Sequence, residues 1–373
     1  MINLANCFEQ QGHHIDLILA RKRGPLIDQV SQSIPIQTLG LQPRMKILPQ
    51  LLQLPSSTRN IALRLLWDKR PKVIRSLTAL VQYLRATPPD VLLTTLDPSN
   101  LVALWAAWLA KGHTRIVIRE ANTISKQISG YGKTFEKHLP FLAQTWYPMA
   151  HNIIAVSDGV AKDLANVTGL SKENITTIHN PLDLPRLQMQ AKEALDDPWF
   201  RPDQPPVLLA VGRLAPQKDY PTLLRAMGTI HKHRRIRLVI LGEGSERTSL
   251  ERLCTQLGLS RDVRMPGFVN NPYQYMAHAS AFVLSSAWEG FPNVLLEAMA
   301  CGCPVISTDC PSGPAELLLQ GTYGPLIRVG DDSGLADAIL SVLENPQDAT
   351  CLKKRAKMFS IETIANQYLQ ALL

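Results

Sequence analysis

The stretch 285–306, SSAWEGFPNVLLEAMACGCPVI, most constrains what this chain can fold into. Pro292 suits the first position of a helix, where its missing N–H would have no intrahelical partner. Apolar residues then recur at helical spacing, so the stretch predicts a loop followed by a helix. Glu289 lies in that loop and Glu297 in the second helical turn, eight positions later. A helix N-terminus carries about half a positive charge and favours a phosphate, while the two carboxylates can accept hydrogen bonds from hydroxyls. The segment therefore suits a ligand that has both groups, such as a nucleotide-sugar.

A second segment, 207–219 (VLLAVGRLAPQKD), predicts a strand followed by a cationic loop. The apolar run 207–211 indicates a buried parallel strand, which ends at Gly212. Arg213 and Lys218 follow on the loop. Two cations there can neutralise a diphosphate, and a guanidinium can bind phosphate oxygens bidentately. Taken alone, either residue could equally be an ordinary surface cation.

These segments resemble the retaining glycosyltransferases of family 4, also called group 1. The resemblance rests on EGFPNVLLEAMACGCPVI and VGRLAPQKD, supported by IRLVILGEG at 236–244 and VRMPGF at 263–268. It implies an α/β fold of the GT-B type, in which two Rossmann-like domains face each other across a cleft. It also implies transfer of a sugar, with retention, from a UDP- or GDP-sugar to a glycan or lipid-linked acceptor in cell-envelope polysaccharide or glycolipid synthesis.

The resemblance also implies residue roles. Glu289, Arg213 and Lys218 are expected to be catalytic: the two cations contact the diphosphate, and Glu289 holds sugar hydroxyls near the reacting carbon. Glu297 is expected to bind the ribose hydroxyls. Phe268 either covers a base face or is a core aromatic. The full set expected to bind the donor is Gly212, Arg213, Lys218, Gly242, Phe268, Gly290, Phe291, Asn293 and Glu297.

We expect no metal site and no cofactor, the nucleotide-sugar being a substrate. The sequence contains no Asp-x-Asp, the motif with which many GT-A glycosyltransferases hold a divalent metal. Arg213, Lys218 and the helix dipole are expected to stabilise the leaving diphosphate instead. Cys301 and Cys303 are separated by one residue, which is not the usual zinc spacing, so buried thiols are the better interpretation.

The acceptor side is predicted at 118–123, IREANT, where Arg119, Glu120 and Asn122 are expected to line the cleft. The chain has a net charge of +8, and residues 41–90 alone contain nine cations and two acids. A basic, apolar segment suits an anionic membrane surface. A solvated basic face is an equal alternative. Nucleic-acid binding is disfavoured because few aromatics interleave the cations.

A length of 373 residues predicts two domains, since single cores rarely grow past about 250–300 residues. Strands are predicted at 15–20, 91–95, 115–118, 152–156 and 175–178, and Ser157 is expected to cap a helix. The predicted organisation is an acceptor-side domain at 1–182, a polar linker at 183–206, a nucleotide-sugar-binding domain at 207–357, and a last helix at 358–373 that crosses back to the first domain.

The beginning of the chain departs from the family pattern. Members open with a strand and a Gly-rich loop, whereas this sequence starts inside the following helix, at NLAN, before Gly12-His13. We expect a true start upstream, with a truncated product as the alternative. No run of 18 apolar residues and no signal peptide is present, which predicts a cytoplasmic protein, at most peripheral on the inner face of the membrane.

Two other functions stay open. One is a catalytically degenerate remnant that binds a nucleotide-sugar without transferring it, and the other is a nucleotide-sugar epimerase on the same fold. The two glutamates together with the Arg213/Lys218 loop favour transfer over epimerisation. The sequence leaves the donor base, the donor sugar, the acceptor and the oligomeric state open.

Overall fold

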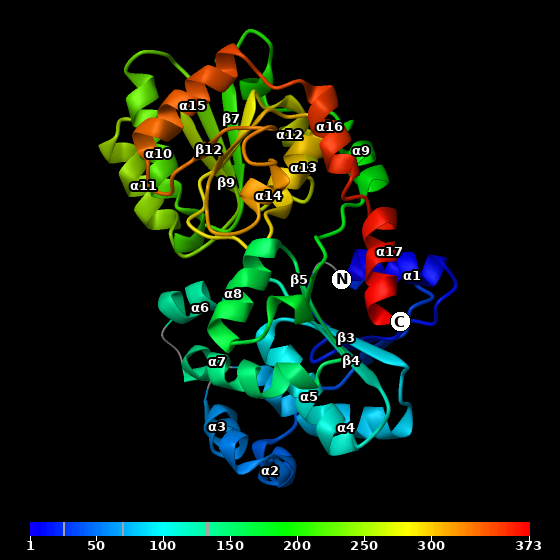
Figure 1. Ribbon diagram of the computed structural model, residues 1–373. Helices are drawn as coiled ribbons and strands as arrows, with labels where there is room; N and C mark the ends of the chain where they lie inside the picture. Colours follow the sequence, from blue (N-terminus) through cyan, green and yellow to red (C-terminus); the bar gives the residue numbers. More distant parts are fainter. Residues whose placement is uncertain (25–26, 69–70, 132–133) are drawn as a thin grey trace. The chain divides into compact units, whose positions relative to one another are not determined.

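The computed structural model describes residues 1–24, 27–68, 71–131 and 134–373 (Figure 1). The chain divides into two compact units, each treated separately below. Unit 1 comprises Met1–Pro181 with Ile361–Leu373, and unit 2 comprises Leu182–Ser360. Parallel strands alternate with helices in both units, which confirms the α/β class predicted from the sequence.

Unit 2 contains one six-stranded parallel sheet of order β12-β11-β10-β7-β8-β9. The order reverses between β7 and β10, which lie side by side although they are the first and fourth strands of the unit. The apolar run predicted at 207–211 is β7. The strands are β7 (Val207–Val211), β8 (Arg237–Leu241), β9 (Val263–Gly267), β10 (Ala281–Leu284), β11 (Val305–Thr308) and β12 (Leu326–Ile327).

Helices cover both faces of this sheet (Figure 1). On one face α10 (Tyr220–His231), α11 (Arg247–Gln256) and α15 (Asp332–Glu344) bury alternate strand residues in an apolar core. On the other face α13 packs against β10, β11, α9, α12 and α16. The bounds of these helices are α9 Leu184–Ala191, α12 Tyr273–His278, α13 Asn293–Cys301 and α16 Ala349–Lys357, and the short α14 spans Pro314–Leu317.

Residues 183–206, predicted to be a linker, fold as part of unit 2. Helix α9 packs against α12 and α13. Trp199 is buried, and the guanidinium groups of Arg237 and Arg264 lie 4.7 Å and 3.8 Å from its ring centroid. The prediction followed the prolines and acids of this stretch, but a stacked tryptophan supplies enough contact to fix it to the unit.

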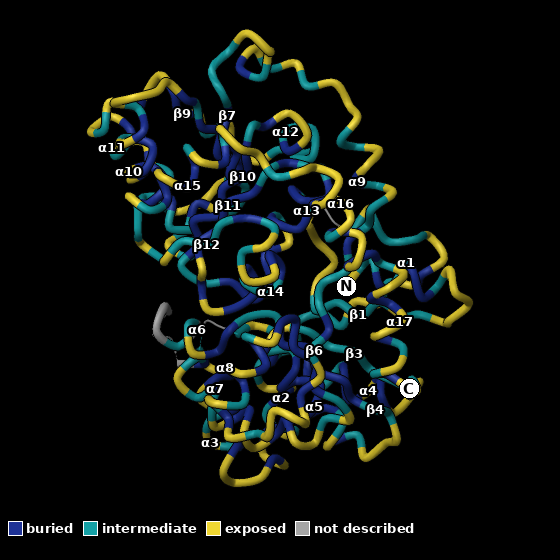
Figure 2. Tube along the Cα trace, turned by 45° about the horizontal axis from the view of Figure 1, so that its top comes forward, coloured by how far each residue is buried: buried dark blue, intermediate teal, exposed yellow. Residues whose placement is uncertain are grey.

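Unit 1 contains two separate parallel sheets. One pairs β1 (Leu17–Leu19) with β2 (Ile36–Thr38), and the other has the order β3-β4-β5-β6. The strands β1 and β3 are half-buried along their whole length. In Figure 2 they are drawn in the intermediate colour, whereas the strands of unit 2 are largely dark blue. The larger sheet is formed by β3 (Val91–Thr95), β4 (Arg115–Glu120), β5 (Asn152–Ala155) and β6 (Ile175–Thr177).

The helices of unit 1 again cover two faces of the larger sheet. On one face α1 (Ile2–Gln10) and α17 (Ile361–Leu372) pack together over Val117 and Ile154. On the other face α5 (Asp97–Ala110) and α8 (Asp158–Thr168) contact the strands, and Ser157 caps α8 by accepting from the Val160 N–H at 3.2 Å. The other helices are α2 (Arg44–Gln53), α3 (Ser56–Trp67), α4 (Leu77–Ala86), α6 (Ile124–Tyr131) and α7 (Thr134–Trp146).

The five strands predicted for the first domain correspond to β1 and β3–β6, within two residues at each end. Strand β2 was not predicted. The last helix, predicted at 358–373, is α17, which is grouped with unit 1. Among the helices of the described ranges, none is both long and apolar enough to cross a lipid bilayer.

Candidate donor-binding site

Most of the predicted donor-binding residues of unit 2 lie in loops at one edge of its sheet, whereas Asn293 and Glu297 are on α13. Gly212 follows β7, Gly242 follows β8, Phe268 follows β9, and the loop to Glu289 follows β10. These four strands are neighbours in the parallel sheet, so their carboxyl ends meet at this edge. The strand order reverses between β10 and β7, and ligands of open α/β sheets bind at such switch points.

Gly242 must be a glycine because two loops touch there. A Cβ at this position would lie 2.0 Å from the backbone oxygen of Gly212. The Gly242 N–H donates to the Gly267 carbonyl at 2.8 Å, and the Gly212 N–H donates to the Leu241 carbonyl at 2.9 Å. The loops that follow β7, β8 and β9 are thereby held close together, an approach that only a residue without a side chain allows at Gly242.

Lys218 and Glu289 form the central contact of the site. The Lys218 Nζ donates to Glu289 Oε1 at 2.6 Å. The two side chains are only 15% and 9% exposed, so this ion pair is largely shielded from solvent. Lys218 ends a 3₁₀ turn, Pro216–Lys218, that follows β7, whereas Glu289 belongs to the loop after β10. The sheet topology thus joins a predicted cation and a predicted carboxylate 71 positions apart.

Serine hydroxyls fix Glu289 from two further sides. The Ser286 Oγ donates to the same Oε1 at 2.7 Å, and the Ser312 Oγ donates to the Glu289 backbone carbonyl. The second carboxylate oxygen makes no hydrogen bond to the described residues. Glu289 is therefore held rigidly and keeps one oxygen with acceptor capacity for a ligand hydroxyl.

The loop that carries Lys218 is also tied to the loop that carries Glu289. The Ser285 Oγ donates to the Lys218 carbonyl at 2.8 Å. The Ala287 N–H donates to the Gln217 carbonyl at 2.8 Å, and the Gln217 Nε2 donates to the Trp288 carbonyl at 3.0 Å. These bonds fix the lysine and carboxylate relative to each other before any ligand arrives, which is what electrostatic preorganisation requires.

Glu297 lies on α13, the helix predicted from the spacing of the apolar residues. The helix begins at Asn293, with Pro292 as its N-cap, one position later than predicted. Glu297 is half-buried, and desolvation raises its pKa to about 7 from the ordinary 4.5. It therefore changes charge near neutral pH, so a partner that hydrogen-bonds to its carboxylate would bind in a pH-dependent way.

The remaining predicted donor residues differ in exposure. Arg213 and Asn293 are exposed, and Arg213 makes no hydrogen bond or ion pair with the described residues. Phe268 is 70% exposed, so the alternative of a core aromatic is wrong. Gly290 and Phe291 are buried, and the Phe291 ring packs 5.7 Å from that of Phe359. Phe291 therefore packs within the core as well as flanking the site.

The predicted acceptor residues lie at the end of β4 in unit 1. Arg119 is 9% exposed and donates from Nε to the Tyr368 hydroxyl at 2.9 Å and from Nη1 to Thr95 Oγ1 at 2.9 Å. Its Nη2 donates to Asn180. The guanidinium thus joins the ends of two strands to α17. Asn122 is half-buried.

Glu120 belongs to a buried polar network. It is 1% exposed and accepts from the Asn100 Nδ2 at 2.7 Å and from the Tyr147 hydroxyl at 2.6 Å. Burial, and then the adjacent Asp97 carboxyl, raise the pKa of Glu120 well above its usual range. The acceptor roles of Arg119, Glu120 and Asn122 stay predictions, and two of these side chains also have clear structural partners.

Sequence reasoning missed the residues that orient the site. It assigned no role to the stretch 307–316, which contains Ser312, and none to Ser285 or Ser286. The serines directly follow β10, so their place at a strand's carboxyl end was an available signal. Their hydrogen bonds depend on contacts across the sheet. In the described part of the chain, no three His, Cys, Asp or Glu side chains gather in a way that could hold a metal ion.

Comparison with known families covers almost the whole chain. The sequence profile described as "Glycosyltransferase Family 4" matches residues 1–186, and the profile described as "Glycosyl transferases group 1" matches residues 191–359. The first match ends close to the boundary between the two units, and the second contains every predicted donor-binding residue.

Characterised relatives point the same way. The chain is 34% identical to the N-acetylgalactosamine-N,N'-diacetylbacillosaminyl-diphospho-undecaprenol 4-alpha-N-acetylgalactosaminyltransferase of Campylobacter jejuni, over 74% of each chain. It is 32% identical to the lipopolysaccharide core biosynthesis glycosyltransferase LpsE of Rhizobium meliloti, over 59% of this chain and 63% of the relative.

Solved structures share the fold. The structure of Anabaena Alr3699/HepE in complex with UDP-glucose superimposes with a TM-score of 0.75 at 20% identity, covering all of this chain and 94% of that one. The apo lipopolysaccharide outer core galactosyltransferase WaaB gives a TM-score of 0.72 at 22% identity, covering 99% and 93%. These neighbours are GT-B proteins with two Rossmann-like domains, which confirms the predicted fold class.

Proposed function

The chain belongs to glycosyltransferase family 4, also called group 1, and on this basis we propose that it transfers a sugar from a UDP- or GDP-sugar to a glycan or lipid-linked acceptor. The acceptor would belong to cell-envelope polysaccharide or glycolipid synthesis, as the names of the Campylobacter and Rhizobium relatives indicate for those proteins. The observation that carries the proposal is the Lys218–Glu289 pair at the switch point of the unit 2 sheet.

The donor's diphosphate would lie against the loop after β7. Arg213 is exposed there and makes no ion pair with the described residues, so it is available for a phosphate oxygen. Lys218 is the second cation, and its ammonium has donors beyond the one given to Glu289. Gly212 and Gly242 would let the backbone approach the diphosphate closely. The exposed Phe268 would cover the base.

Glu289 and Glu297 would recognise the two sugars of the donor. Glu289 offers a carboxylate oxygen with no bond to the described residues, which suits a hydroxyl of the transferred sugar. Glu297 on α13 would accept from the ribose hydroxyls. A ribose hydroxyl binds best to the ionised carboxylate, and this links donor affinity to the pKa of about 7.

In the proposed reaction the bond between the anomeric carbon and the phosphate oxygen breaks, and the nucleoside diphosphate leaves with the electron pair. The acceptor hydroxyl oxygen attacks from the face that the leaving group vacates, so configuration is retained, and its proton passes to the leaving phosphate oxygen. Arg213, Lys218 and the N-terminus of α13 would stabilise the charge that develops on that oxygen, without a metal ion.

We also propose that residues 41–90 place the enzyme on the anionic inner face of a membrane. This segment carries nine cations and two acids. Exposed apolar side chains accompany them: Met45 is 67% exposed and Trp67 is 60% exposed. An aromatic ring beside cations suits the head-group layer of a bilayer. Such a position would bring unit 1 to a lipid-linked acceptor.

A second candidate is a protein that binds a nucleotide-sugar without transferring it. The observation in its favour is the division of the strands of unit 1 into two sheets, with β1 and β3 half-buried, in the unit that contains the predicted acceptor residues. Strand edges without neighbours are less firmly held than paired ones.

Calorimetric titration with UDP, GDP and ADP, with a chelator and then with added Mg²⁺, tests the donor part of the proposal. We expect one nucleotide to bind with the chelator present. Incubation with the matching nucleotide-sugar and a short lipid diphosphate glycan, read by NMR at the anomeric proton, tests the transfer. Nucleotide binding without transfer would favour the second candidate, and conversion of the nucleotide-sugar alone would indicate an epimerase. Absence of nucleotide binding would refute all three.

A further inference from the structure

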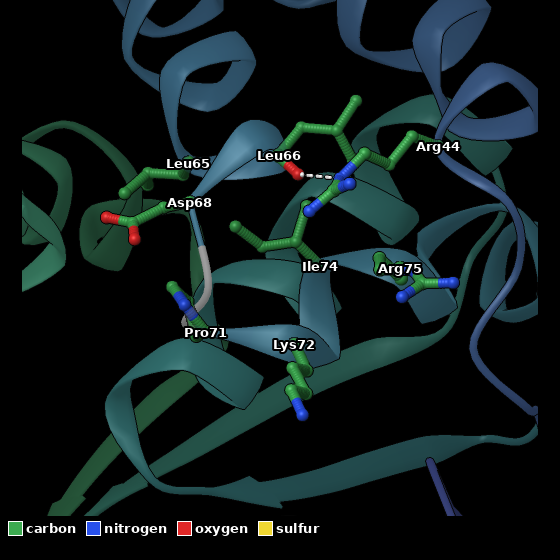
Figure 3. A pocket seen from close by; sticks show the side chains of 8 residues that line it. All are labelled: Arg44, Leu65, Leu66, Asp68, Pro71, Lys72, Ile74 and Arg75. Atoms are coloured by element: carbon green, nitrogen blue, oxygen red, sulfur yellow. Dashed lines mark hydrogen bonds between the residues drawn. The ribbon is translucent and has the colours of Figure 1, made fainter.

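Unit 1 contains a pocket far in sequence from the donor site. It has a volume of about 230 Å³ and lies between the start of α2, the end of α3 and the 3₁₀ turn Lys72–Ser76 (Figure 3). Its floor is apolar because it is formed by the side chains of Leu65, Leu66 and Ile74. Each of these residues is at most 2% exposed. The residues that line it are Arg44, Leu65, Leu66, Asp68, Pro71, Lys72, Ile74 and Arg75.

Backbone carbonyls hold the two arginines of the pocket. The Arg44 Nε donates to the Leu66 carbonyl at 2.9 Å, and its guanidinium lies 5.4 Å from the centroid of the Trp67 ring. The Arg75 Nε donates to the Gln42 carbonyl at 2.9 Å. A carbonyl orients a guanidinium without neutralising it, and the Nη donors of Arg44 make no hydrogen bond to the described residues.

The pocket has an excess of positive charge. Arg44, Lys72 and Arg75 line it together with a single carboxylate, that of Asp68. Within the described ranges, none of the three cations forms an ion pair. Arg44 and Arg75 are held by backbone carbonyls, whereas Lys72 is exposed. Cations beside buried apolar side chains attract an anion more strongly than the same cations in open water, because the local dielectric constant is lower.

Exposed apolar side chains lie on the same two helices. Met45 and Leu52 of α2 are 67% and 50% exposed, and Trp67 ends α3 beside the Arg44 guanidinium. Figure 2 shows exposed stretches along both helices. Exposed apolar side chains on the helices that carry a cationic pocket suit a ligand whose phosphate is attached to an apolar body, with the body outside the pocket.

We propose that the Arg44/Lys72/Arg75 pocket binds the phosphate of an anionic membrane lipid. The volume is below the roughly 300–1,000 Å³ of sites that enclose drug-sized molecules, so the pocket takes the head group while the acyl chains stay in the bilayer. The inference rests on the proposed membrane association of residues 41–90 and makes it specific: one pocket, rather than the summed charge of the segment, recognises the lipid.

Vesicle co-sedimentation with two double variants of equal charge tests this. The pocket variant is Arg44→Gln with Lys72→Gln. The control is Lys46→Gln with Arg59→Gln, which removes an arginine and a lysine from α2 and α3 but leaves the pocket intact. With phosphatidylcholine vesicles that contain phosphatidic acid, we expect the pocket variant to lose about tenfold more affinity than the control. Equal losses would mean a diffuse basic surface and would overturn the proposal.

A single substitution tests the same proposal with a variant that we expect to fold normally. Lys72 is exposed and makes no hydrogen bond or ion pair with the described residues, so Lys72→Gln should leave the thermal unfolding temperature unchanged. Compared with Lys46→Gln, it should still bind vesicles several-fold more weakly, because Lys46 does not line the pocket. Identical vesicle binding by these two folded variants would likewise contradict the proposal.

A second arm distinguishes a lipid from a soluble phosphate compound. Glycerol 3-phosphate, compared with chloride at equal ionic strength, should release the wild-type chain from the vesicles and leave the residual binding of the pocket variant unaffected. A contrary result has two parts: glycerol 3-phosphate binds the wild type but not the pocket variant, and the two double variants bind vesicles equally well. In that case the ligand of the pocket is a soluble phosphate compound and the lipid assignment is wrong. If the wild-type protein binds vesicles through the pocket but binds no nucleotide, the proposed transferase function is wrong and the lipid-binding proposal is still supported.

Discussion

The strands β7 and β3 have nearly the same sequence in two very different settings. β7 reads VLLAV and β3 reads VLLTT. β7 lies in the middle of the unit 2 sheet, between β8 and β10, and four of its five residues are buried. Among the strands of the described ranges, β3 pairs with β4 alone, and all five of its residues are half-buried.

The difference teaches that neighbours, rather than the strand's own sequence, decide burial. An apolar run of this length is compatible with a fully buried strand, and nothing within the run distinguishes a central position from an edge. Unit 2 surrounds β7 with two strands and two layers of helices. Unit 1 leaves one edge of β3 without a strand partner among the described residues. We therefore expect chemistry and rigidity to be concentrated in unit 2.

The largest expected effect is on transfer by the rigid site of unit 2. Lys218→Gln keeps a hydrogen-bond donor near Glu289 but removes the charge that would stabilise the leaving diphosphate, so kcat/KM should fall by about 10²–10³-fold. Steady-state kinetics with the matching nucleotide-sugar measure this. The control is Lys232→Gln, an exposed lysine just after α10 in the same unit. Activity near the wild-type level in Lys218→Gln would remove the lysine from the mechanism.

The next prediction compares how much β7 and β3 each contribute to the stability of their units. Leu209→Ala and Leu93→Ala truncate the third residue of β7 and of β3. Leu209 is fully buried, so we expect a loss of about 2–5 kcal/mol in the stability of unit 2. Leu93 is half-buried and should cost roughly half as much in unit 1. Hydrogen exchange followed by mass spectrometry reads each unit separately. Equal costs would show that β3 is as firmly packed as β7.

A third effect concerns pH and the Glu297 carboxyl of unit 2. The folded-state pKa of Glu297 is about 7, above the ordinary 4.5, so the folded chain binds a proton more tightly than the unfolded chain does. This contribution to stability is fully present at pH values below the ordinary pKa and is lost as pH rises through about 7. Wild type should therefore be less stable than Glu297→Gln at alkaline pH by at most about 3 kcal/mol, and the gap should close in acid.

Thermal unfolding of both proteins across this pH range measures the gap, and a constant gap would show that Glu297 does not titrate there. Nucleotide binding should move in the opposite sense. If the ionised Glu297 accepts from the ribose, wild-type affinity rises as pH increases through about 7, whereas the affinity of Glu297→Gln stays flat. Parallel pH profiles for the two proteins would count against the ribose role.

The smallest expected effect is at the exposed ring of Phe268. Because this side chain is 70% exposed, Phe268→Ala should change the stability of unit 2 by no more than about 0.5 kcal/mol. Loss of a stacked base should weaken nucleotide binding about fivefold, which corresponds to about 1 kcal/mol. Calorimetry checks the affinity, with Phe268→Trp as the variant that keeps a stacking surface. Unchanged affinity in Phe268→Ala would refute the base contact.

Sequence prediction succeeded best where local pattern and resemblance agreed. Helix α13 was predicted from Pro292 and the spacing of apolar residues after it, and it begins one residue later. The five strands predicted for unit 1 and the strand at 207–211 in unit 2 were placed closely, whereas β2, whose sequence IQT is short and mostly polar, was not predicted. Residues 183–206 were predicted to be a linker from their prolines and acids. In the structure they are grouped with unit 2, where Trp199 contacts two arginines that are distant in sequence.

The sequence by itself determined the family and the parallel α/β class and predicted the residues of the candidate donor site, because these depend on short-range patterns and on motifs that keep their order along the chain. Only the tertiary structure decided that Lys218 meets Glu289, that serines hold the carboxylate, and that Arg119 joins α17 to the ends of two strands. These contacts arise where parallel strands that are distant in sequence become neighbours in a sheet. The sequence of a single strand does not specify which other strands will lie beside it.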